Sequence, residues 1–291
     1  RGKESIAIGV DITHNNGFTG AGAGNKNISI GIDITNNNRS QAIAIGQQVS
    51  VSEIYDLAIG YDVNTTGTGY TGAIAIGNRG TQSTRGSVAI GNNARSSNYH
   101  GVSIGRNTSS HVSNVAIGLE ANAVQSGAAA IGVSVSTGNY GVSVGSNQTT
   151  GTHGVSIGKF NDTSTDAVSV GSTNSATVGG VAIGRNTRAG RDGVAIGKNI
   201  VTSSYSAVSI GMNNTGGDHG AVLIGVNNSD IYRGAFVVGK GNYGISAYRN
   251  SYRGMVIGVE NHTIGGYGFT TARGTGDFFV VGRNNYDIRS G

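Results

Sequence analysis

The 291-residue sequence contains no cysteine, no proline and no tryptophan. The lack of cysteine excludes disulfide bonds, thiolate zinc sites and cysteine nucleophiles. No stretch approaches the roughly 20 apolar residues that a membrane-spanning helix needs, and no charged segment with a short apolar run marks a signal peptide. Charged residues make up only 12% of the chain, and its net charge of +5 includes no run of Lys and Arg. This composition argues against a dedicated nucleic-acid-binding protein.

Glycine, in contrast, is abundant: 52 of the 291 residues are glycine, which is about 18% of the chain, whereas about 7% is usual. Many of these glycines close a recurring tetrapeptide, Val-Ala-Ile-Gly or a close variant. Between Gly77 and Gly239 the repeat recurs every 13 or 14 residues. A fixed short period is the signature of a repeat architecture. The repeat glycines are Gly9, Gly31, Gly46, Gly60, Gly77, Gly91, Gly105, Gly118, Gly132, Gly145, Gly158, Gly171, Gly184, Gly197, Gly211, Gly225, Gly239, Gly258 and Gly282.

Each copy of the repeat alternates between two kinds of side chain. The residue before the glycine is always Ile or Val, and the residue three before it is always apolar. Between them lies Ala or Ser in the first fifteen copies. A period of two predicts a short strand whose two faces differ.

These strands predict an all-β protein, a parallel β-solenoid of about 19 coils. A coil of 13 or 14 residues is too short for a helix and a strand, so we expect two short strands and two tight turns. We expect the branched aliphatic side chains to stack inside. Glycine suits a positive φ where the strand ends, and Asn commonly follows two residues later, where it tolerates the left-handed conformation. Proline would remove an N–H that a central strand must donate.

The segment Ser87 to Ala94, which reads Ser-Val-Ala-Ile-Gly-Asn-Asn-Ala, and its relatives resemble the head repeats of YadA-like trimeric autotransporter adhesins. The resemblance covers nearly the whole chain. It implies a left-handed parallel β-roll, a homotrimer, display outside the cell and adhesion to a surface or host matrix. No heptad pattern of a stalk is present. We therefore expect the head portion of such a protein or the same repeat in another fibre, such as a phage tail fibre or an extracellular filament.

The column of Ala and Ser residues has two interpretations. Small side chains let two backbones approach closely, so the column is a candidate seam where three chains meet. Alternatively, it fills the tight interior of a single roll. The candidate seam residues are Ala89, Ser103, Ala116, Ala130, Ser143, Ser156, Ser169, Ala182, Ala195 and Ser209.

The pattern changes towards the C-terminus and divides the chain into regular repeats, 1–217, and modified repeats, 218–291. From Gly225 onward the small column is replaced by Leu223, Val237, Val256 and Val280. The third residue after the glycine becomes Asn at the same stage, and stacked Asn side chains can hydrogen-bond along a solenoid. The spacing between repeat glycines is also longer in this part of the chain, which indicates insertions between its coils.

These insertions are rich in aromatic residues and arginine, the types enriched at binding hot spots. We predict a recognition surface at this end, suited to a protein or to a glycan, whose sugar face stacks on a flat ring. The alternative is a cap that folds over the end of the core. The candidate ligand-binding residues are Tyr232, Arg233, Tyr248, Arg249, Tyr252, Arg253, Tyr267, Phe269 and Arg273.

No motif in the sequence predicts catalysis, a metal or a cofactor. Its Gly-x-Gly patterns do not stand between a strand and a helix, as a phosphate-binding loop requires. We therefore expect a non-enzymatic extracellular protein, at a cell surface or in a virion fibre, whose partners are itself and a surface, matrix or glycan ligand. The alternatives are a filament that stacks end to end and a receptor-binding segment of a phage fibre. An ice-binding surface would need a regular Thr column, which is missing.

Overall fold

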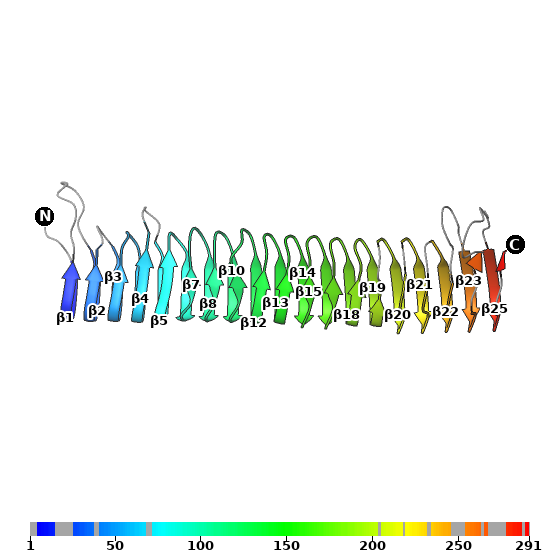
Figure 1. Ribbon diagram of the computed structural model, residues 1–291. Helices are drawn as coiled ribbons and strands as arrows, with labels where there is room; N and C mark the ends of the chain where they lie inside the picture. The colour runs from blue at the N-terminus through cyan, green and yellow to red at the C-terminus, as the bar shows by residue number, and fades with distance from the viewer. Residues whose placement is uncertain are drawn as a thin grey trace. The chain divides into compact units, whose positions relative to one another are not determined.

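The computed structural model describes residues 5–14, 26–37, 41–67, 72–202, 205–217, 219–231, 234–245, 254–262, 265–266, 278–286 and 289–290. These residues form strands and turns, and no helix occurs among them. None of them could therefore cross a membrane as a helix. The chain forms two compact units, residues 1–147 and 148–291. Within each unit the strands follow one another in chain order (Figure 1).

The first unit holds twelve complete strands and the beginning of a thirteenth. They are β1 (Ile6–His14), β2 (Ile28–Asn36), β3 (Ile43–Val51), β4 (Leu57–Thr66), β5 (Ile74–Thr84), β6 (Val88–Asn92), β7 (Arg95–Ser96), β8 (Val102–Arg106), β9 (Ser109–Ser110), β10 (Val115–Leu119), β11 (Asn122–Ala123), β12 (Ala129–Thr137) and β13 (Val142–Thr150).

The second unit continues the same alternation of longer and shorter strands. They are β14 (Val155–Lys159), β15 (Asp162–Thr163), β16 (Val168–Ser172), β17 (Ser175–Ala176), β18 (Val181–Ala189), β19 (Val194–Val201), β20 (Val208–Met212), β21 (Val222–Val226), β22 (Phe236–Lys240), β23 (Gly254–Val259), β24 (Gly265–Gly266), β25 (Phe278–Arg283) and β26 (Arg289–Ser290).

Successive copies of the repeat pair in parallel and in register, which confirms the predicted β-solenoid. In the pairing of β16 with β18, Val168 lies opposite Val181 and Gly171 opposite Gly184. The short β17 pairs with the C-terminal end of the same β18. Each coil thus contains two strand segments, either separate or merged into one strand of about nine residues such as β18.

The inner and outer sides of the coil are the reverse of our expectation. In β18 the small residue Ala182 is buried, while its neighbours Val181 and Ile183 are only partly buried on the outside. The same order of burial holds along β6, β10, β16 and β19. The prediction that the branched side chains of the tetrapeptide stack inside is wrong, because the interior between the two strand segments is narrow. In the regular coils the first segment contributes Ala or Ser to it, and the second contributes Ser, Thr, Asn and Ala or, in some coils, an aliphatic residue such as Ile34 or Ile200.

The predicted seam is wrong for the same reason. All ten residues of the small column have a relative exposure of 0% within the single chain, so no second chain can reach them. They are Ala89, Ser103, Ala116, Ala130, Ser143, Ser156, Ser169, Ala182, Ala195 and Ser209. The structure favours the alternative considered above, in which small side chains fill a tight interior.

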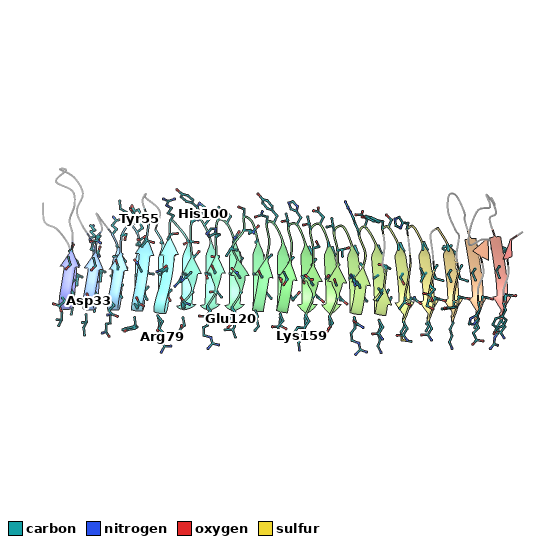
Figure 2. All side chains as sticks on the ribbon, viewed as in Figure 1. Asp33, Tyr55, Arg79, His100, Glu120 and Lys159 are labelled. Carbon is teal, nitrogen blue, oxygen red and sulfur yellow. The ribbon has the colours of Figure 1, made fainter. Side chains whose placement is uncertain are left out.

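The predicted positive φ angles of the turn are confirmed at the end of the first strand segment. Every repeat glycine has φ between 120° and 157°, and the Asn residues two positions later have φ between 51° and 57°. In the first unit this turn forms one edge of the coils, on which Asp33, Arg79 and Glu120 lie (Figure 2). Tyr55 and His100 project from the opposite edge, where the connecting loops lie.

The repeat glycines are irreplaceable because successive coils touch through them, and this can be tested in the second unit. A Cβ atom at Gly184 would overlap the carbonyl oxygen of Gly197, whereas a Cβ atom at Gly220 has no neighbour within 4 Å. We expect Gly184→Ala to destabilise the protein by more than about 4 kcal/mol. Gly220→Ala, which only places Ala at a positive φ, should cost about 1–2 kcal/mol. Urea unfolding followed by circular dichroism measures both, and equal losses would contradict the contact between coils.

Candidate functional site

The nine predicted ligand-binding residues lie outside the described residues, so the recognition surface predicted on them stays a prediction. They are Tyr232, Arg233, Tyr248, Arg249, Tyr252, Arg253, Tyr267, Phe269 and Arg273. The coils from which their loops emerge are described, however, and they carry aromatic residues that the sequence analysis did not select.

Three aromatic residues form a ladder on the second strand segment of these coils: Tyr243, His262 and Tyr286. Parallel bridges join Tyr243 to His262 and His262 to Tyr286. The ring centroids of Tyr243 and His262 lie 6.2 Å apart, and those of His262 and Tyr286 lie 5.1 Å apart with the planes inclined by only 13°. Tyr243 and Tyr286 are 48% and 64% exposed. The ladder therefore exposes much of two tyrosine side chains to solvent.

A second ladder, made of buried amides, holds the aromatic ladder in register. Asn242, Asn261 and Asn285 directly precede its members, and the side chain of each points inward while that of the next residue points outward. The Asn242 amide donates to Oδ1 of Asn228 at 2.9 Å, and the Asn261 amide donates to Oδ1 of Asn242 at 2.8 Å. The predicted hydrogen bonding between stacked Asn side chains is thus confirmed. It keeps these coils in register despite the insertions between them.

The core below these coils differs from that of the preceding coils. One cluster of buried residues contains Leu223, Ile231, Val237, Ile245 and Val256. In the first strand segment, Leu223, Val237 and Val256 stand where the earlier coils have Ala or Ser. The site therefore stands on a packed core rather than on a flexible loop.

Charged side chains near the ladder are few and exposed. Nη2 of Arg283 lies 4.0 Å from Oε2 of Glu260, at the limit of an ion pair, and both side chains are well exposed. No three His, Asp or Glu residues in the described part of the chain converge as metal ligands would. The arrangement offers stacking, apolar contact and hydrogen bonds from phenol groups, which suits recognition of a sugar or an exposed side chain.

The sequence contained a signal for this ladder that the analysis missed. Its members are the fourth residues after Gly239, Gly258 and Gly282. Reading that column would have found them. Insertions of different length separate these copies by 19 and 24 residues, so the aromatic residues look scattered along the chain.

The buried amide ladder predicts a large cost for removing one of its members. In Asn242→Ala, the N–H of Asn261 and the carbonyl of Gly258 lose their partner in a buried environment. Because an unsatisfied buried polar group costs about 1–3 kcal/mol, we expect a loss of about 3–4 kcal/mol in urea unfolding. Asn227→Ala is the matched control, since Asn227 belongs to an exposed ladder, and it should cost about 1 kcal/mol. Similar values for both variants would contradict the role of burial.

The comparisons with known proteins leave the geometry as the main guide to function. No model of a known protein family matches the chain, and neither does any curated protein.

Proposed function

We propose that this chain is a non-enzymatic, extracellular adhesin or fibre protein that assembles as a homotrimer and binds a surface, matrix or glycan ligand through its C-terminal coils. One observation carries the proposal. The branched aliphatic residues, one and three positions before each repeat glycine, lie on the outside of the coils. We call this surface the aliphatic face.

The aliphatic face is too apolar and too regular to remain in water. Ile131, Ile157 and Ile210 are 38%, 43% and 38% exposed, and each further coil adds another pair of such residues. Contiguous apolar patches larger than a few hundred Å² mark interaction sites on soluble proteins. Because the patch grows with every coil, its partner must be as long and as regular as the coils themselves.

A second and a third copy of this chain meet that requirement. The residues of the face stack in register at about 4.8 Å intervals, so an identical face offers matching ridges and grooves along its whole length. The resemblance of the repeat to trimeric adhesin heads favours three copies over two. The aromatic ladder lies on the other strand segment of the coil, so it stays accessible when the aliphatic face is covered.

Charged residues on the aliphatic face should dissociate the trimer into monomers whose coils stay folded. We expect the double variant Ile157→Glu, Ile210→Glu to weaken assembly by at least about 3 kcal/mol, because its carboxylates would be buried without partners. Light scattering should change from three times the 29.3 kDa chain mass to one. The control Ser175→Glu, Thr215→Glu adds the same charges to the second strand segment and should remain trimeric. A monomeric wild-type chain, or open-ended polymers, would refute the proposed trimer.

The aromatic ladder should carry ligand binding. Both Tyr243 and Tyr286 are largely exposed, so their replacement by Ala should shift the melting temperature by less than about 2 °C, yet weaken binding at least about tenfold. An array of immobilised glycans and matrix proteins provides the readout. Tyr205→Ala is the control, because Tyr205 is equally exposed, at 48%, but lies on the loop edge of other coils. Unchanged binding by the ladder variant would exclude the ladder as the recognition surface.

A further inference from the structure

Five basic residues of the second unit stand in a single row, although they are far apart in the sequence. Each is the first residue after a repeat glycine: Lys159, Arg185, Lys198, Lys240 and Arg283. We propose that this row, here called the cation line, is a binding site for a linear anionic polysaccharide. The row borders the aliphatic face, since only the repeat glycine separates each cation from the aliphatic residue before it, and it lies on a different strand segment from the aromatic ladder.

The strand pairing places the five residues in one column. Arg185 lies directly opposite Lys198 on the neighbouring strand. Ser172 stands between Lys159 and Arg185, Met212 and Val226 between Lys198 and Lys240, and Val259 between Lys240 and Arg283. With a spacing of about 4.8 Å between coils, neighbouring cations are therefore one, two or three coils apart.

The cations of this line are exposed and have little negative charge near them. All five are exposed, and Lys159 lies on the turn edge of its unit (Figure 2). Among the described residues, the only ion pair to the line joins Arg283 and Glu260 at 4.0 Å. Arg185 and Lys198 are like charges on directly paired strands, an arrangement that costs stability. A polyanion that lies along the line would remove this repulsion.

An exposed amide ladder runs beside the central part of the cation line. Asn186 donates to Asn199 at 3.1 Å, and Asn199 to Asn213 and Asn213 to Asn227 at 3.0 Å. Each amide has two N–H groups and uses one of them in the ladder. The second N–H and a free lone pair of the carbonyl oxygen are available to the hydroxyl groups of a sugar chain.

The corresponding column of the first unit is not basic, which shows that the turn does not itself require basic residues. There the first residue after the repeat glycine is basic only at Arg106, and the next position holds Asp11, Asp33, Asp62 and Glu120 together with Arg79. The row in the second unit is one residue wide, straight within the unit and accompanied by hydrogen-bonding amides. These features fit a thin chain with carboxylate or sulfate groups at intervals better than the wide, evenly charged surface of a DNA duplex.

The cation line can be tested with the full chain and defined polymers. We expect the wild-type protein to bind heparin or polygalacturonate at 50 mM salt and not to bind neutral dextran. At 500 mM salt it should lose most of that affinity, because the charges are screened. Arg185→Gln, Lys198→Gln should weaken binding at least about tenfold without lowering the melting temperature. Preference for heparin or for polygalacturonate identifies sulfate or carboxylate as the recognised group.

The matched control is Arg188→Gln, in the same coil as Arg185 but on the second strand segment, where Arg188 pairs with Ser175 and Val201. It should change the affinity less than about twofold. The proposal is overturned if wild-type protein binds neither polymer, if duplex DNA or vesicles of anionic lipid bind more tightly than both, or if the control loses as much affinity as the double variant. If the double variant is less stable, Lys159→Gln, Lys240→Gln, which involves no directly paired cations, repeats the test.

Discussion

The backbones of successive coils approach each other so closely at the repeat glycines that no Cβ atom fits between them. At Gly184 the neighbouring carbonyl of Gly197 occupies the space that any Cβ atom would need. This contact, together with a positive φ at every repeat glycine, fixes where the first strand segment ends and where the chain turns. Because the same turn recurs in every coil, each later position of the repeat falls into a straight column within its unit. The repeat therefore arranges chemically similar residues in columns along each unit.

The narrow space between the two strand segments decides which column lies inside. Ala182 and its equivalents fill it, so Val181 and Ile183 must point outward. In most β-proteins the branched residues of an alternating strand form the core, but here the first strand segment turns its small residues inward in most coils. The outer face of that segment is thus apolar, and the interior is partly polar, with hydroxyl and amide groups that bond to the backbone. The proposed assembly rests on this outer face.

The outward-facing residues in the turns and on the second strand segment are free of these packing constraints. The column that contains Arg185 and Lys198 and the column that contains Tyr243 and Tyr286 point to solvent, so their side chains can vary without changing the coil. The buried amides of Asn228, Asn242 and Asn261 maintain the register where insertions lengthen the connections. The rigid interior can therefore carry different exposed rows on different parts of the same chain.

The period, the strand, the turn at each glycine and the left-handed Asn two residues later could be predicted from the sequence, because these features depend on local backbone geometry. The sequence also indicated the stacking of the Asn column. It did not determine which face of the strand lies inside, since a period of two marks two different faces without telling which one the opposite segment covers. For that reason Ile183 was expected inside, where it does not lie, and the column of Ala182 had two interpretations, of which the structure favours the interior. Only the tertiary structure brought Tyr243 beside His262 and Arg185 beside Lys198, because residues a whole coil apart become neighbours only when the chain is wound in register.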